Sequence, residues 1–196
     1  MARVTQSQPT PPRALRSDAQ RNRERIAQAA VATLQREGLA VPMATIAADA
    51  GVGTGTLYRH FPTREELLDE LTHRSFLLML SRLHQASESA GTAIEAMRAF
   101  LVAVIADRND MLLPSTGGPA VQSERTRALQ RQHHEAITAL IARGSADGTI
   151  RRKVDVWDIA WLGATLAQPG RPEPSWDAIC LRLLDTYLAG LGVPGG

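Results

Sequence analysis

The chain has 196 residues, 44% of them hydrophobic and 21% charged, with a formal net charge of +2; this length holds a sizeable core in one or two domains, and this composition excludes a disordered chain. The one cysteine, Cys180, excludes an intrachain disulfide and a cysteine-based zinc site. No apolar run approaches about 18 residues and no apolar segment follows Arg3, so we expect no membrane span and no signal peptide, and place the protein in the cytoplasm.

The N-terminal third of the chain is basic. Residues 1–64 carry nine arginines and four acidic residues, a charge of +5, whereas residues 65–196 carry 13 basic and 16 acidic residues, a charge of −3. This asymmetry indicates a nucleic-acid-facing module joined to a separate body, the alternative being a chance excess of charge on a solvated surface. Residues 1–16 are polar, contain proline and lack periodicity, which predicts a disordered basic tail.

The first helix is predicted from Ser17 to Glu37. Ser17 and Gln20 have the spacing of a capping box, and Gly38 suits the end of the helix because glycine readily adopts a positive φ. Apolar or small residues recur along this segment at helical spacing: Ile26, Ala29, Ala30, Thr33 and Leu34. The stripe predicts that one face of the helix is buried.

Two short helices follow, joined by a tight turn. Pro42 suits the start of the first, which places Met43, Ile46, Ala47 and Ala50 on one face. Gly51-Val52-Gly53 forms the turn, and the second helix runs from about Thr54 to His60. This is a helix-turn-helix, whose second helix enters the major groove of DNA. Near that helix, short hydroxyl residues and longer side chains can donate hydrogen bonds to DNA, and a glycine allows close approach to it. The candidate DNA contacts are Thr54, Gly55, Thr56, Tyr58, Arg59, His60 and Arg64.

The rest of the chain also predicts helices. Capping-box spacing at Thr63–Glu66 and Thr92–Glu95 begins two of them, and the glycine and proline residues of 109–121 and 168–174 interrupt the pattern. The predicted helices span residues 63–89, 92–108, 123–143, 155–168 and 175–191. Since no strand pattern occurs, we expect an all-α fold with about nine helices. Residues 17–63 form the DNA-binding domain and residues 64–196 the ligand-binding and dimerisation domain.

Residues 43–68 read MATIAADAGVGTGTLYRHFPTREELL. With the preceding RIAQAAVATLQREGL, this string resembles the tetracycline-repressor (TetR) family of transcriptional regulators over about residues 17–70. Pro42, Gly53 and Thr54 depart from the residues that many members have there. The resemblance implies a homodimeric regulator, usually a repressor, that binds a palindromic operator in double-stranded DNA. A small molecule bound by the C-terminal domain releases the DNA.

The resemblance also implies that the last two helices form a four-helix dimer interface. The second of them carries a broad apolar stripe, and the first carries small residues that allow close approach. Core packing within one subunit is the alternative. The candidate interface residues are Ala160, Gly163, Ala167, Trp176, Cys180, Leu183 and Tyr187.

A pocket for the small-molecule effector is predicted among the middle helices. Ligand pockets are mostly apolar with a few polar groups, although each residue named can equally fill an ordinary core. The low aromatic content favours aliphatic walls over an aromatic cage. The candidate pocket residues are Phe76, Met79, Leu80, Leu83, Phe100, Val104, Met111, Ile137 and Trp161.

No other motif predicts a metal, a cofactor or catalysis. Glu70 and His73 have the Glu-x-x-His spacing of di-iron bundles, but those sites need two such motifs. His133 and His134 are adjacent and point about 100° apart on a helix, so we interpret them as solvated residues. Cys180 lies in an apolar stripe and is interpreted as an inert thiol. A helical-bundle enzyme and a DNA-binding protein without an effector remain the alternative functions.

Overall fold

The computed structural model describes the backbone of residues 12–169 and 175–192, and side chains from residue 19 onward. Within these ranges the chain forms helices and loops and no strand, which confirms the all-α prediction. They contain eight α-helices, one for each segment predicted above, where the total was expected to be about nine. The predicted loop between residues 106 and 124 contains two short 3-10 turns, η1 (Arg108–Asp110) and η2 (Pro114–Thr116).

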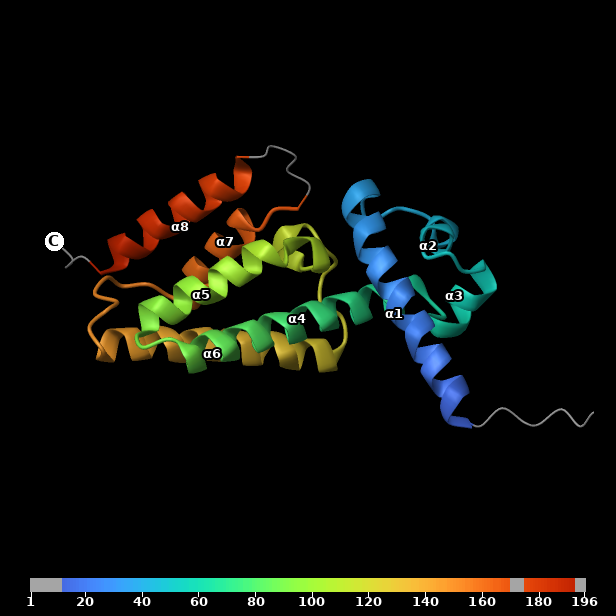
Figure 1. Ribbon diagram of the computed structural model, residues 1–196, viewed down its shortest axis with the longest axis horizontal. Coiled ribbons are helices and arrows are strands. Elements are labelled where there is room, and N and C mark those ends of the chain that lie inside the picture. The colour runs from blue at the N-terminus through green and yellow to red at the C-terminus, as the bar shows by residue number, and fades with distance from the viewer. Residues whose placement is uncertain (1–11, 170–174, 193–196) are drawn as a thin grey trace, which may run out of the picture.

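Three helices make the N-terminal lobe: α1 (Pro12–Glu37), α2 (Met43–Asp49) and α3 (Thr54–His60) (Figure 1). The predicted start of the first helix at Ser17 is wrong, since α1 begins at Pro12 and includes residues assigned to the tail. Proline suits the first helical turn, and Ala14, Leu15 and Arg16 favour helix, so polar composition misled the prediction. Residues 1–11 of the predicted tail lie outside the described residues.

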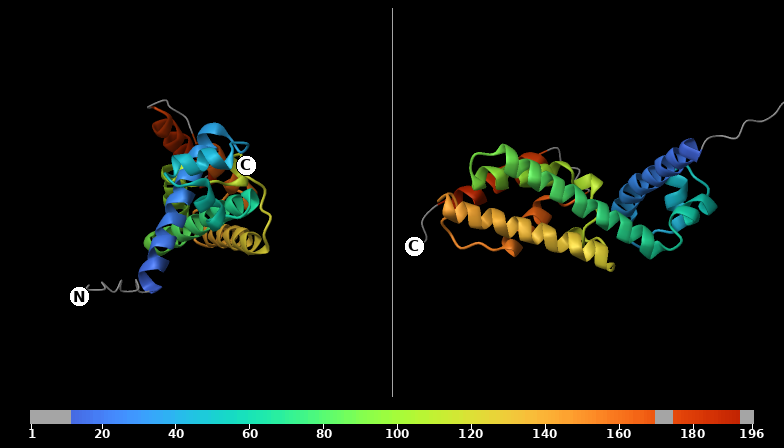
Figure 2. Two further views of the ribbon diagram at one scale, coloured as in Figure 1. Left: turned by 90° about the vertical axis from the view of Figure 1, so that its right-hand side faces the viewer. Right: turned by 90° about the horizontal axis from the view of Figure 1, so that it is seen from below.

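Five helices make the rest: α4 (Arg64–Ser89), α5 (Ala93–Ala106), α6 (Glu124–Ala146), α7 (Val156–Leu166) and α8 (Trp176–Leu191). The capping predictions at α4 and α5 are confirmed, because Thr63 and Thr92 accept the backbone N–H of the glutamate three residues on, and α5 has the complete capping box. Ser175 makes no side-chain cap of α8. Figures 1 and 2 show α4 leading from the N-terminal lobe into the bundle, where it packs between α5 and α6.

Two hydrophobic cores divide the chain. The DNA-lobe core joins the buried face of α1 to α2 and α3, and it includes Ile26, Ile46 and Leu57, all fully buried. Leu67 and Leu71 of α4 also belong to it, as does Leu112 from the loop after α5. The bundle core holds the buried residues of α5–α8 and the rest of α4. The boundary between the two cores therefore lies inside α4, after Leu71, and not at the start of this helix before Arg64.

Candidate DNA-binding and effector sites

The face of α3 that points away from the DNA-lobe core carries the predicted contact residues. Leu57 is completely buried and fixes the helix, while Thr54, Gly55 and Arg59 are exposed. Tyr58 is 46% exposed, which is unusual for so large a ring. Thr56 and His60 are half-buried. The sequence thus places hydroxyls, a phenol and a guanidinium together on one accessible surface, and these groups donate to phosphates and base edges.

Gly55 lies in the first turn of α3. A Cβ added there would meet no protein atom within 4 Å. The backbone of Gly55 is helical and its φ is not positive. The packing of this chain therefore does not need a glycine at this position.

Arg64 has a structural role that the sequence analysis did not predict. Its guanidinium donates to the carbonyl of Val41 at 2.6 Å and also to the carbonyl of Leu39. These two carbonyls belong to the loop between α1 and α2. Arg64 therefore holds this loop against the start of α4, and its predicted DNA contact stays a prediction.

Other arginines of the basic N-terminal third also serve the fold. Arg25 donates to the carbonyl of Ala50, which caps the C-terminal end of α2, at 2.9 Å. Arg36 pairs with Asp49 at 2.6 Å, and the hydroxyl of Thr33 donates to the same carboxylate. Asp49 thereby joins α2 to α1, and these hydrogen bonds lower its pKa. Arg25, Arg36 and Arg64, three of the nine arginines that indicated nucleic-acid binding, thus stabilise the helix-turn-helix itself.

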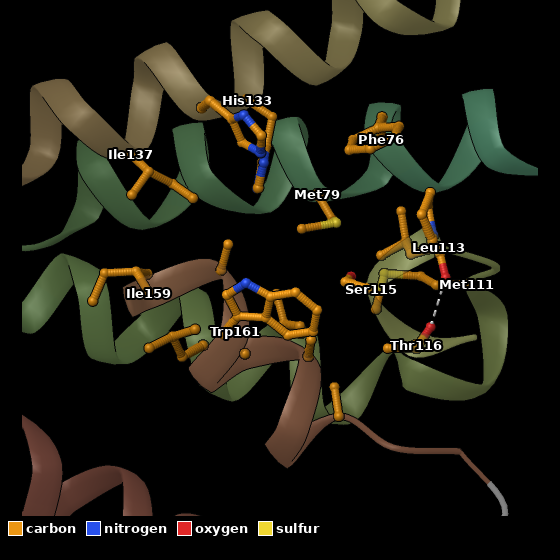
Figure 3. A pocket seen from close by; sticks show the side chains of 18 of the residues that line it. Phe76, Met79, Met111, Leu113, Ser115, Thr116, His133, Ile137, Ile159 and Trp161 are labelled. Atoms are coloured by element: carbon orange, nitrogen blue, oxygen red, sulfur yellow. Dashed lines mark hydrogen bonds between the residues drawn. The ribbon is translucent and has the colours of Figure 1, made fainter. Parts of the chain in front are cut away.

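A cavity of about 240 Å³ lies in the bundle between α4, α5, α6, α7 and η2 (Figure 3). Its walls are mainly apolar. Leu80 and Leu83 are buried but do not line it, because they lie one helical turn farther along α4 than Phe76 and Met79. The other seven predicted pocket residues do line it: Phe76, Met79, Phe100, Val104, Met111, Ile137 and Trp161.

The cavity wall is mixed: aliphatic residues are the larger part of it, as expected, and aromatic rings are also present. Four of the eight Phe, Trp and Tyr residues of the chain line this one cavity: Phe76, Phe100, Trp157 and Trp161. Trp157 is 55% and Trp161 61% exposed, so both stand where the cavity meets the surface. Composition gives the number of aromatic residues in the chain and not their concentration at one place, so it did not indicate that half of them gather here.

His133 is the most deeply buried polar side chain of the cavity wall, which also includes Ser115, Thr116 and Gln130. The interpretation of this residue as solvated is wrong, since only 2% of it is exposed. Its ring lies between Phe76 and Phe100, with centroids 6.1 and 5.9 Å away, and among the described residues neither ring nitrogen has a hydrogen-bond partner. Burial, and to a smaller extent neighbouring His134, lowers the pKa of His133 to about 4. The ring is therefore neutral at pH 7. Figure 3 shows it extending from α6 into the space that Trp161 borders from α7.

Among the described residues, Arg108 is the one charged side chain in the cavity wall. It donates to the carbonyl of Ile105 at 3.0 Å and pairs with Asp177 at the start of α8. Its charge is therefore neutralised by the protein itself.

The predicted interface residues of α7 and α8 divide into two groups. Gly163, Ala167 and Cys180 are buried inside the subunit, so for them the alternative of core packing is correct. A Cβ on Gly163 would lie 3.2 Å from Leu101, and burial raises the pKa of the Cys180 thiol. The others are Ala160, which lines the cavity, Trp176 and Tyr187, which are half-buried, and Leu183, which is 52% exposed.

A family model described as bacterial regulatory proteins, tetR family, matches residues 26–71. This range begins and ends with residues of the DNA-lobe core. The HTH-type transcriptional repressor KstR of Mycolicibacterium smegmatis is 31% identical over 165 residues, which cover 76% of this chain and 80% of that protein. The chain belongs to the tetR family. Its function is therefore DNA-binding transcriptional regulation, and the relatives named here are described as transcriptional regulators.

Solved structures of tetR-family proteins extend the similarity over both lobes. The regulator SCO0520 from Streptomyces coelicolor is 30% identical with a TM-score of 0.58, over 89% of this chain and 99% of that one. A regulator from Mycobacterium vanbaalenii is 27% identical with a TM-score of 0.63, over 91% of this chain and 99% of that one. Among the described residues, no helix combines the length and apolar character that crossing a membrane requires.

In this tetR-family protein one short segment belongs to both lobes. Met111 and Leu113 line the cavity, whereas Leu112 between them is buried in the DNA-lobe core. The amide of Gln35 on α1 donates to the carbonyl of Met111 at 2.8 Å, and the backbone N–H of Leu112 donates to the Ser75 hydroxyl at 2.8 Å. Sequence analysis missed Leu112 because nothing in a loop pattern shows which core its side chain enters.

A second link is a cluster of charges at Glu70 on α4. Arg23 on α1 pairs with Glu70 at 3.0 Å, Arg74 at 2.9 Å, and Arg125 on α6 at 3.2 Å. Burial alone would raise the pKa of Glu70, but the hydrogen bonds from the three arginines outweigh it and lower the pKa to about 2. Arg23 also donates to the carbonyl of His60, the last residue of α3. The cluster thus connects the start of α6 to the end of α3.

Proposed function

We propose that this chain is a homodimeric repressor that leaves a palindromic operator when a small molecule enters the cavity of the bundle. The observation that carries the proposal is the alternation at residues 111–113. Two side chains face the cavity while the one between them is in the DNA-lobe core. An occupant that displaces Met111 and Leu113 also displaces Leu112, because the three residues share one backbone.

The exposed face of α3 is the proposed reading surface for DNA. In a helix-turn-helix dimer the two recognition helices meet half-sites one helical turn, about 34 Å, or a multiple of it apart. A change in the angle between the two lobes alters that spacing. An effector then releases DNA if it binds the altered arrangement more tightly than the DNA-bound one.

The proposed dimer contact is the outward face of α7 and α8. Ile179, Leu183 and Tyr187 follow one another at intervals of four residues on α8, and Leu183 is the most exposed of them. Such an interval places side chains on one face of a helix. A two-fold contact uses the same patch on both subunits, which suits a single apolar stripe.

The test is a binding titration of a duplex selected from genomic fragments by the purified protein, beside a scrambled duplex. We expect sequence-selective binding by two protomers per duplex, with an affinity that falls steeply when the salt concentration is raised, because phosphate contacts release counterions. Equal affinity for the scrambled duplex would contradict the assignment of α3 as a reading helix.

The dimer is tested in the same titration with Leu183→Glu. Burying an unpaired carboxylate on each side of a two-fold interface should weaken dimerisation at least about a hundredfold and weaken operator binding with it. Leu77→Glu is the matched control, because Leu77 is 48% exposed on α4. If Leu183→Glu sediments as a dimer and Leu77→Glu does not, the interface lies elsewhere.

A further inference from the structure

We propose that the effector is a neutral, flat, mainly apolar molecule whose single hydrogen-bonding oxygen contacts the ring of His133. This inference rests on the proposed function, since it names the chemistry of the molecule that the cavity takes.

The shape follows from the rings that face the cavity. Phe76 and Phe100 flank His133 on one side, and Trp161 from α7 borders the space on the opposite side (Figure 3). Aromatic rings pack favourably against other rings, offset or edge to face. The cavity volume of about 240 Å³ is small for a ligand pocket, which favours a compact ring system over a long chain.

The polar group follows from His133 itself. The residue is 2% exposed, and within the described part of the chain its two ring nitrogens have no partner. Buried polar groups in folded proteins are nearly always hydrogen-bonded. A neutral imidazole offers one donor and one acceptor, so a hydroxyl or a carbonyl oxygen on the occupant satisfies it.

The absence of net charge follows from the neighbours of that ring. A carboxylate in the cavity would be buried, and a buried charge needs a partner of opposite charge. Arg108 in the wall is already paired with Asp177, and burial lowers the pKa values of both His133 and His134. The cavity wall therefore offers an anion no free positive charge among the residues described.

The probes are 1-naphthol, naphthalene and 1-naphthoate, which share one ring system and differ in the polar group. We expect calorimetric titration of the full-length wild-type protein to show 1-naphthol binding about tenfold more tightly than naphthalene, the effect of one buried hydrogen bond, and 1-naphthoate binding most weakly. In His133→Phe the ratio of the two affinities should fall to about one while naphthalene still binds. His84→Phe, the same substitution at an exposed histidine of α4 that does not line the cavity, should keep the preference.

A second measurement needs no variant. The NMR signals of the His133 ring nitrogens in the wild-type protein should shift when 1-naphthol binds and not when naphthalene binds. The inference is overturned if the two probes bind equally, if His133→Phe keeps the preference, if 1-naphthoate binds most tightly, or if none of the three binds. Equal binding of naphthol and naphthalene would leave the proposed function intact. That function is decided separately by a cavity-filling variant, Ala160→Trp, which needs no ligand.

Discussion

Arg23 shows how a single side chain can join three helices. It donates to the last residue of α3, pairs with Glu70 of α4, and lies over the ring of Phe61 at 4.4 Å. From the sequence it counted only as one unit of positive charge. His133 shows the opposite case, because a residue interpreted as solvated is a buried, neutral ring in a cavity wall. In both, the environment of the residue decides its chemistry, and that environment comes from helices distant in the sequence.

The buried ring of His133 makes stability depend on pH. Its pKa is lowered from 6.5 to about 4, so between these values the unfolded chain binds a proton that the folded chain does not. The unfolding free energy contributed by this site is fully present above pH 6.5 and is lost as the pH falls towards 4. We expect His133→Phe to be about 1 kcal/mol more stable than wild type at pH 7, since two unpartnered nitrogens are removed.

The difference in unfolding free energy between His133→Phe and wild type should increase as the pH approaches 4, by at most about 3 kcal/mol over its value at pH 7. Chemical denaturation at pH 7, 5.5 and 4.5 measures it. A difference that stays constant over this range would show that the ring is not neutral and buried. His73 and His134 also have lowered pKa values, so the variant retains part of the pH dependence.

At the scale of helices, the sequence was informative where signals are local. The capping residues Thr63 and Thr92 and the glycine-containing turn before α3 depend on neighbours within a few residues, and the structure has them as predicted. Local signals failed for contacts across the chain. No periodicity shows that Leu112 enters the DNA-lobe core, or that Arg64 turns back to the α1–α2 loop.

Helix α3 offers a test that separates folding from DNA binding. Because a Cβ at Gly55 would meet no protein atom, Gly55→Ala should leave stability unchanged or raise it by up to about 1 kcal/mol through helix propensity. We expect operator affinity to fall about tenfold, since the methyl group separates α3 from the DNA it approaches. Thermal unfolding and operator titration measure the two effects.

Gly91→Ala is the control for this substitution. Gly91 precedes α5 in the bundle, and a Cβ there makes only an ordinary contact of 3.4 Å with Glu95. Gly91→Ala should leave operator affinity unchanged. Unaltered operator binding by Gly55→Ala would place the closest approach to DNA on another part of the lobe.

At the scale of the whole molecule, the two lobes are joined by α4, by the charges around Glu70 and by residues 111–113. The family and the all-α architecture follow from the sequence of the helix-turn-helix and from helical periodicity. The cavity does not, because its walls come from four helices and the two 3-10 turns, whose packing leaves room beside His133. The central claim is that occupancy of this cavity controls DNA binding.

Filling the cavity by substitution tests that claim most directly. Ala160 on α7 lines the cavity, whereas Ala139 on α6 is exposed, so Ala160→Trp and Ala139→Trp add the same ring inside and outside. The measurement is operator affinity of both variants without any ligand, with folding checked by circular dichroism and dimerisation by sedimentation, because Ala160 is also a candidate interface residue. We predict that Ala160→Trp binds the operator at least about fivefold more weakly than wild type, within the usual range of allosteric coupling, and that Ala139→Trp does not. A folded Ala160→Trp that binds the operator as tightly as Ala139→Trp would contradict the claim.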